Sequence, residues 1–423
     1  MNREILRLAI PNIISNISVP LLSAVDTGLM GHVSTLHLGA IGLSTMIFNF
    51  LYWNFGFLRM GTTGMVAQAY GKNDNAAARE LLFKFMMIGL TVSLGLIIFG
   101  PFLLDASNGL LSVSEEQIPL VKDYFGIIIY GAPAVLTSFC LMGWLFGMQD
   151  AFLPLVVTVT INVINILLSY YMVRYLNMGI AGVAYGTLIA QYVGLLMLLF
   201  FIVIKYKWII SGVHFPKGDW LAFARVNVDL FIRTVALTVA FSFFYRQSSS
   251  SGHLMLAANV VLLQFLSWMS YGIDGFAYAA ESLVGKYKGA GNNILLRLSI
   301  KRAFQWGLVL SSVYMIIYFF GFQRIARIFS NDTGVLEIIQ NYRLWIALLP
   351  IGAFVCYIWD GILIGLTATK IMRNSMLISL TLYFVTFLIL RDISNNAIWI
   401  SLALFLIIRG VIQSYYWIYG KIE

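Results

Sequence analysis

The first apolar segment of the chain, residues 6–31, carries a carboxylate, Asp26, where a lipid bilayer makes one costly. Alternating steps of four and three residues place Asp26 on one helix face with Asn12, Asn16 and Ser23. A helix exposed to lipid all round does not carry such a stripe, so this face must contact protein or a water-filled cavity. The alternative is that Asp26 lies near the outer end of its helix and is merely solvated.

A second polar stripe follows the apolar segment at 152–173. Steps of four, three and four residues place its members on one helix face. The next apolar segment, 178–204, presents two further polar side chains after three glycines that permit close helix approach. The stripe consists of Thr158, Asn162, Asn165 and Ser169, and the next segment adds Thr187 and Gln191.

Depth suggests which of these polar groups meet. At the helical rise of about 1.5 Å per residue, Asp26, Asn165 and Thr187 each lie roughly 7 to 15 Å below the outer surface. We therefore expect one pocket in which a carboxylate, an amide and a hydroxyl surround either a proton on Asp26 or a small hard cation held by oxygens, such as Na⁺. The competing interpretation is that the amides only join helices through hydrogen bonds.

The composition places the whole chain in a membrane. Of its 423 residues 60% are hydrophobic and 11% are charged, against about 25% charged in soluble domains. Spans of about 20 residues give about twelve predicted helices. They cover residues 6–31, 36–59, 82–104, 118–142, 152–173, 178–204, 227–245, 253–273, 300–321, 335–357, 372–390 and 396–418.

The net charge of +9 reflects topology and does not indicate nucleic-acid binding. Most lysines and arginines fall in alternate connecting segments, including both chain ends, as the positive-inside rule predicts for cytoplasmic termini. Cys140 and Cys356 lie inside predicted spans, so we expect no disulfide. We expect an inner-membrane protein with both termini in the cytoplasm, a lipid bilayer as its environment and a monomeric state.

Two GxxxG pairs, Gly143 with Gly147 and Gly361 with Gly365, lie 218 residues apart. Gly-Lys pairs at Gly71 and Gly285 repeat at a similar offset, which indicates duplication of a six-helix unit. Because six is even, both units have the same orientation. We predict an all-α membrane protein of two pseudosymmetric six-helix bundles around a central cleft. The expected parts are an N-terminal lobe at 1–205, a cytoplasmic linker at 206–218 and a C-terminal lobe at 219–423.

The sequence gives no sign of an enzyme. P-loop, GxSxG and CxxC motifs are absent, and the four histidines have no partners at metal-ligand spacing. We therefore expect no catalytic residues, no resident metal and no cofactor. Any transport must be driven by an ion gradient or be passive.

The second half has acids of its own. Arg233 follows Asp229 by one helical turn, so we expect these two to pair. Asp360 lies at or just past the inner end of the span at 335–357. It is the second candidate for a functional acid, as a group that attracts cations at the mouth of the cleft.

Several motifs stand out along the chain, namely LAIPNII, VDTGLMGH, NVINILLS, RVNVDLFIRT at 225–234 and YGIDGFAYAAESLVGKYKGAGN at 271–292. They resemble those of the multidrug and toxic compound extrusion (MATE) transporters, in the DinF-like branch. Their order and spacing cover essentially the whole chain. The resemblance implies two six-helix lobes around a central cleft. It also implies export of bulky cationic or amphipathic compounds in exchange for protons or sodium.

The resemblance also implies roles for individual residues. The family's first-helix aspartate falls on Asp26, and its first-helix proline, associated with bending, falls on Pro11. The family's asparagine and threonine in the fifth and sixth helices fall on Asn165 and Thr187. Many members carry a second aspartate where this chain has Ser169. The pocket therefore has one acid, which leaves the coupling ion open and lowers the expected affinity for sodium.

Together these observations predict a secondary antiporter for small amphipathic or cationic molecules. The alternative within the same superfamily is a flippase for lipids or lipid-linked oligosaccharides. A flippase needs several cationic side chains in its cavity for a pyrophosphate, and the spans hold few, chiefly Arg59, Arg233, Arg343 and Arg409. A membrane-embedded enzyme or receptor without transport is a third class, which the duplication and the missing catalytic cluster disfavour.

Overall fold

The computed structural model describes residues 1–31, 34–111, 114–209, 220–391 and 395–420. Within these ranges the regular structure is entirely helical. Twelve helices in the described part of the chain are long and apolar enough to cross a membrane. The expected all-α membrane fold with twelve spans is confirmed.

The chain forms two compact units, Ile14–Asp219 and Met1–Ile13 with Trp220–Glu423. The first 13 residues thus pack with the second half of the chain, although they belong to the same helix as Asp26. The lobe boundaries at 205 and 219 and the cleft stay predictions. Most of the expected linker at 206–218 lies outside the described residues.

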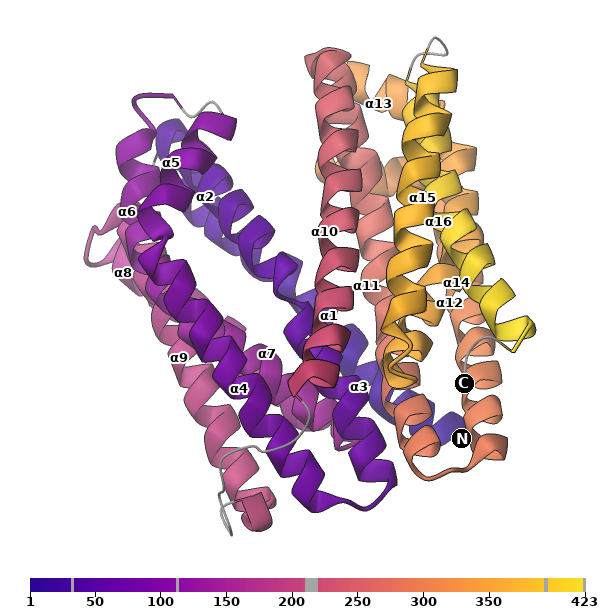
Figure 1. Cartoon of the computed structure of the whole chain (residues 1–423). Helices are drawn as coiled ribbons and strands as arrows, with labels where there is room; N and C mark the ends of the chain where they lie inside the picture. The colour runs from indigo at the N-terminus through magenta and orange to yellow at the C-terminus, as the bar shows by residue number, and fades with distance from the viewer. Residues whose placement is uncertain (32–33, 112–113, 210–219, 392–394, 421–423) are drawn as a thin grey trace. The chain divides into compact units, whose positions relative to one another are not determined.

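The unit Ile14–Asp219 contains most of α1 and the helices up to η2 (Figure 1). Within it, α8 packs along α9, and α7 packs against both α3 and α4. The helices are α1 (Asn2–Gly31), α2 (Thr35–Asn54), α3 (Phe57–Gly71), α4 (Asn75–Ile98), α5 (Gly100–Leu111), α6 (Ile118–Ile128), η1 (Ile129–Gly131), α7 (Ala132–Gly147), α8 (Phe152–Arg174), α9 (Gly179–Lys205) and η2 (Lys207–Ile209).

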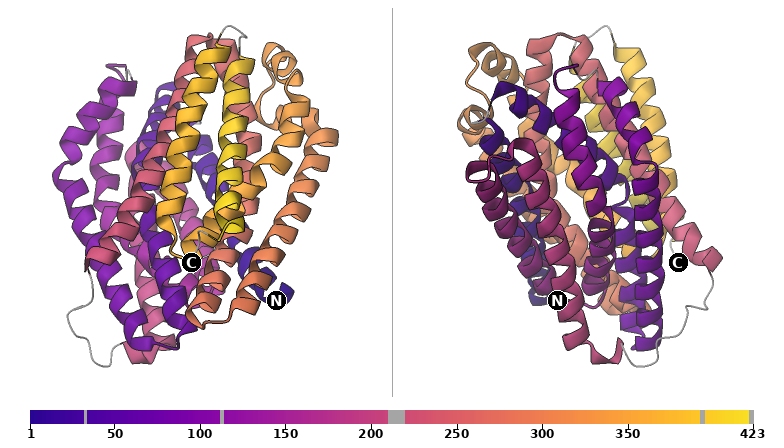
Figure 2. Two further views of the ribbon diagram at one scale, coloured as in Figure 1. Left: turned by 45° about the vertical axis from the view of Figure 1, so that its right-hand side comes forward. Right: turned by 90° about the vertical axis from the view of Figure 1, so that its left-hand side faces the viewer.

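The second unit is a bundle in which α14 packs against α11, α12 and α16, while α15 lies along α10 and α16 (Figure 2). Its helices are α10 (Trp220–Ser250), α11 (His253–Gly289), α12 (Asn293–Phe329), α13 (Thr333–Gln340), α14 (Arg343–Gly365), α15 (Thr369–Leu390) and α16 (Asn396–Ile418). The start of α1 joins this bundle, where Glu4 accepts hydrogen bonds from Lys286 at 3.3 Å and from Tyr287 at 3.2 Å.

Some helices are longer than hydropathy predicts. The span predicted at 253–273 continues to Gly289, and the span predicted at 36–59 continues as α3 to Gly71. Both extensions carry small and polar side chains that lower the local hydropathy. They stay helical because they pack against α14 and α7 respectively, and such packing supplies most helix stability in proteins.

The glycine pairs explain that packing, and they do so in the same way in both halves. A Cβ on Gly143 would lie 2.4 Å from the carbonyl oxygen of Arg59, and one on Gly361 would lie 2.1 Å from that of Ala277. A Cβ on Gly147 would lie 3.0 Å from the nitrogen of Ala67, and one on Gly365 would lie 3.0 Å from that of Gly285. Each contact recurs 218 residues later, which supports the predicted duplication.

Gly361→Ala should therefore destabilise the bundle. Its new methyl group meets backbone rather than a movable side chain, so α11 and α14 must separate, at a cost of about 2 to 3 kcal/mol. The matched control is Gly95→Ala in α4, where a Cβ meets nothing within 4 Å. Thermal unfolding of the purified variants in detergent measures the difference. Equal midpoints for the two variants would contradict the close approach.

Candidate functional site

Asp26 lies in α1, five residues before the helix ends at Gly31. Its Oδ1 atom is buried and has no hydrogen-bond partner in the part of the chain that the structure describes. The ion pairs found among these described residues do not include it. A buried carboxylate in this situation retains its full desolvation cost when it is charged.

A closed polar network joins α8 and α9. The amide nitrogen of Asn165 donates to the Thr187 hydroxyl at 2.9 Å, and the Ser169 hydroxyl donates to the Asn165 oxygen at 3.1 Å. The Thr187 hydroxyl donates to the carbonyl of Val183 at 2.9 Å. Each of these donors is thus committed elsewhere, and none is directed at Asp26. Asn165 and Ser169 share a face as their spacing predicts, and Asn165 meets Thr187 as their depth predicts; a common pocket with Asp26 stays a prediction.

Close approach of the two helices makes this network possible. A Cβ on Gly186 would lie 2.6 Å from the Ser169 hydroxyl oxygen, and one on Gly182 would lie 3.1 Å from the backbone of Met172. Only glycine fits such contacts without moving a helix. The glycines at the start of α9 therefore set the distance between Asn165 and Thr187.

Tyr124 of α6 connects the network with Asp26. Its hydroxyl hydrogen-bonds with Thr45 and Thr187, and its side chain lies within electrostatic range of the Asp26 carboxylate. The sequence analysis did not single out Tyr124. It lies six residues into its helix, at a depth comparable with the other three residues, so the same depth argument applied to tyrosines would have found it.

Asn162 does not join this network. Its amide donates to the Ser18 hydroxyl at 2.9 Å, and Ser18 precedes Asp26 by two helical turns. This contact holds α8 to α1, as the interpretation of interhelical bonding predicts for this residue. Pro11 lies inside the continuous helix α1, two residues before the two units divide at Ile13.

The expected pairing of Asp229 with Arg233 is wrong. Asp229 instead accepts from Arg373 of α15 at 2.6 Å and from Thr369 at 3.2 Å, and Arg233 pairs with Asp360 of α14. An exposed pair one turn apart on a helix contributes only about 0.3–0.5 kcal/mol. Partners on adjacent helices, which the local spacing does not reveal, therefore take precedence.

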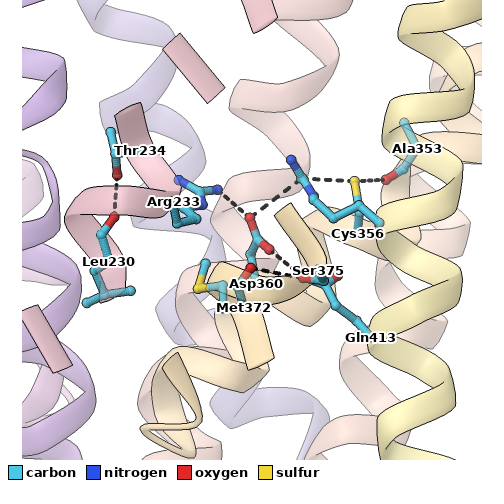
Figure 3. Close-up of polar contacts among 10 residues, drawn as sticks. Leu230, Arg233, Thr234, Ala353, Cys356, Asp360, Met372, Ser375 and Gln413 are labelled. Atoms are coloured by element: carbon cyan, nitrogen blue, oxygen red, sulfur yellow. Dashed lines mark hydrogen bonds and ion pairs between the residues drawn. The ribbon is translucent and has the colours of Figure 1, made fainter. Parts of the chain in front are cut away.

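Asp360 also differs from its prediction. It lies within α14, five residues before Gly365, and its side chain is 9% exposed. One carboxylate oxygen contacts Arg233 and, at 3.5 Å, Arg409; the other accepts from Gln413 at 2.9 Å (Figure 3). Arg409 also donates to the sulfur of Cys356 at 3.0 Å. Two guanidinium groups compensate this carboxylate, so it is not a group that attracts cations.

The two units thus differ in whether their buried acid has a cationic partner. Asp360 has permanent positive partners, and its charge is balanced without any bound ion. Asp26 has no ion pair among the described residues, and Tyr124 is the neighbour within electrostatic range. No cluster of three or more histidine, cysteine or acidic side chains suited to a metal ion occurs among the described residues.

A family model described as MatE matches residues 11–171 and 231–389. The chain belongs to the MatE family. The two matched stretches correspond to the two halves that share the glycine contacts. This membership confirms the resemblance to MATE transporters, and it makes the protein a multi-pass membrane protein of the multidrug-efflux family.

Curated relatives agree with this assignment. DNA damage-inducible protein F of Escherichia coli is 31% identical over 98% of this chain and 92% of its own length. The probable multidrug resistance protein NorM of Thermotoga maritima is 25% identical over 80% of this chain and 74% of its own. A solved structure of MATE in a bent conformation matches 99% of this chain and 95% of its own with a TM-score of 0.87. At 18% identity that likeness establishes the fold alone.

Removing one partner of the Asp360 cluster should destabilise the protein. Asp360→Asn leaves two buried guanidinium groups without their carboxylate, which costs about 3–5 kcal/mol. Adding Arg233→Gln removes one of the two unbalanced charges and should restore part of the loss. Asp26→Asn is the matched control, because it breaks no ion pair and should be neutral or stabilising. Denaturant unfolding of the purified proteins tests this, and equal losses for the two single variants would contradict it.

Proposed function

We propose that this protein is a secondary antiporter that exports bulky cationic or amphipathic compounds in exchange for protons or sodium. Asp26 is its coupling carboxylate. The observation that carries this proposal is the buried Asp26 oxygen without a partner among the described residues, in contrast to the compensated Asp360. Asp360 cannot bind an ion from a gradient without losing its arginine partners. Asp26 has no such partners to lose.

Binding of a proton or Na⁺ removes or shields the charge on Asp26. Tyr124, within electrostatic range of Asp26, and the Asn165 and Thr187 oxygens that its network contains are the proposed further ligands. In the outward-open state this event lets α1 repack or bend near Pro11 and expels the substrate. Coupling requires that Asp26 bind the ion with different affinities in the two states, because a ligand shifts an equilibrium only by its differential affinity.

The position of Pro11 supports this mechanism. Proline lacks the N–H that would bond to the carbonyl one turn earlier, so a helix bends there at low cost. The structure divides α1 between the two units two residues later. A change of α1 at Pro11 can therefore link the occupancy of Asp26 to the unit that holds the start of the helix.

The distribution of basic residues supports an inner-membrane protein with both termini in the cytoplasm. The flippase alternative is less favoured. It requires cationic side chains that are available for a pyrophosphate, and two of the four arginines in the spans, Arg233 and Arg409, already face Asp360. We also propose that the antiporter is a monomer.

Asp26→Asn should abolish coupled export. Exporter-deficient cells expressing the native protein should accumulate less of a fluorescent cationic dye, and cells expressing the variant should accumulate as much as cells without the protein. Collapsing the proton and sodium gradients separately identifies the coupling ion. Asp105→Asn, an exposed acid of α5, is the control at equal expression. Normal export by Asp26→Asn would overturn the proposal, and lipid translocation without dye export would favour the flippase.

A second pair of variants tests the neighbouring oxygens. Thr187→Val removes a ligand beside Asp26 and should raise the ion concentration needed for half-maximal export by about tenfold. Thr160→Val is the matched control, because the Thr160 hydroxyl donates to Val156 of its own helix at 2.8 Å, outside this network. Equal effects of the two variants would place the ion elsewhere.

A further inference from the structure

An apolar pocket lies in the unit Ile14–Asp219, where α4, α7, α9 and η2 meet. Its volume is about 180 Å³. Every side chain that lines it is a hydrocarbon, an aromatic ring or a thioether. They are Leu82, Phe83, Met86, Leu141, Leu199, Ile202, Val203 and Ile209.

The pocket connects the core with the outside of the helix bundle. Leu141, Ile202 and Leu82 are buried and belong to the hydrophobic core around Trp144. Val203 is 39% exposed, and it belongs to a face of α9 on which Phe200 is also exposed. Because α9 is a candidate membrane span, a surrounding bilayer would cover this opening with lipid chains.

Basic side chains gather at one end of the pocket. Lys207 is exposed and precedes the lining residue Ile209 by two positions. Arg79 precedes the lining residue Leu82 by one helical turn and donates to the carbonyl of Trp208 at 3.3 Å. Lys205 pairs with Asp150 at 2.7 Å and is 54% exposed.

Aromatic side chains lie at the same end. Trp144, Tyr206 and Trp208 pack together, with ring centroids 4.9 Å apart for Trp144 and Tyr206 and 6.1 Å apart for Trp144 and Trp208. Trp144 is buried in the core, whereas Tyr206 and Trp208 are half-buried, and tryptophan and tyrosine at a protein surface concentrate at the level of lipid headgroups. The apolar part of the pocket therefore lies at acyl-chain depth, and its basic end lies at headgroup depth.

This combination fits one kind of ligand. Dry apolar cavities of about 150 Å³ bind benzene-sized hydrocarbons, so the pocket has room for several methylene groups of a chain. Basic groups beside spanning helices attract anionic headgroups. A zwitterionic lipid would satisfy the apolar part equally well and would gain less at the basic end.

We propose that this pocket is a binding site for an anionic phospholipid. One acyl chain lies between α4 and α9, and the phosphate lies against Lys207 and Arg79. The bound lipid fills the gap between the two helices and joins the end of α9 to the start of α4. This site is separate from Asp26 and does not depend on the transport proposal.

Native mass spectrometry of the purified full chain tests the site. The protein in mild detergent receives equal amounts of phosphatidylglycerol and phosphatidylcholine with the same acyl chains. We expect preferential retention of phosphatidylglycerol, and a loss of about fivefold in that preference in Lys207→Gln, since each basic residue near the headgroup contributes a factor of this size. Lys122→Gln in α6, an exposed residue of a helix that does not line the pocket, is the charge control.

Filling the pocket tests the acyl chain. Met86→Trp places a large ring in the cavity and should abolish retention of both lipids. Met87→Trp, next to it in α4 but 37% exposed and outside the lining, should leave retention unchanged. Thermal unfolding verifies that each variant is folded. Equal retention of both lipids by the native protein or unchanged retention in Met86→Trp would overturn the proposal. Binding of a free fatty acid as strong as that of phosphatidylglycerol would also overturn it.

Discussion

A charged carboxylate inside a membrane protein needs a counter-charge, and this requirement organises both halves of the chain. Asp360 obtains its counter-charge from Arg233 and Arg409, which come from α10 and α16. Asp26 has no such partner among the described residues; Tyr124 lies within electrostatic range of it and joins the network of Asn165, Ser169 and Thr187 through the Thr187 hydroxyl. In the proposed mechanism a proton or another cation balances the charge on Asp26, whereas Asp360 already has its counter-charge within the protein.

The backbone packing of α3 with α7 in one half is nearly the same as that of α11 with α14 in the other. The glycine pairs of α7 and α14 approach α3 and α11 at equivalent backbone atoms, and the family match divides into two stretches of similar length. The chemistry differs because side chains, not backbone contacts, distinguish the halves. Arginines of α10 and α16 surround the acid in one unit, whereas α8 and α9 offer only neutral oxygens and nitrogens in the other. Duplication supplied one scaffold for two electrostatic environments.

The transmembrane helices and part of the polar site were predictable from the sequence. Apolar runs specify spans directly, and helical spacing specifies faces, so the twelve helices and the grouping of Asn165, Ser169 and Thr187 followed. The partners of Asp360 could not be predicted, because Arg233 and Arg409 lie more than 45 residues away in sequence and only tertiary packing brings them to Asp360. The local pairing of Asp229 with Arg233 was wrong for the same reason. Tyr124 was missed because one tyrosine among 22 carries no distinguishing local pattern.

The most direct test counts the cations that each acid binds. Purified native protein, Asp26→Asn and Asp360→Asn would be compared by proton release on a rapid rise in pH and by equilibrium binding of radioactive sodium. If Asp26 is the exchangeable site, the native protein should bind one more proton or one more sodium ion per chain than Asp26→Asn. Folded Asp360→Asn should bind as many as the native protein. Equal counts for native protein and Asp26→Asn, or a loss confined to Asp360→Asn, would show that the coupling charge lies elsewhere.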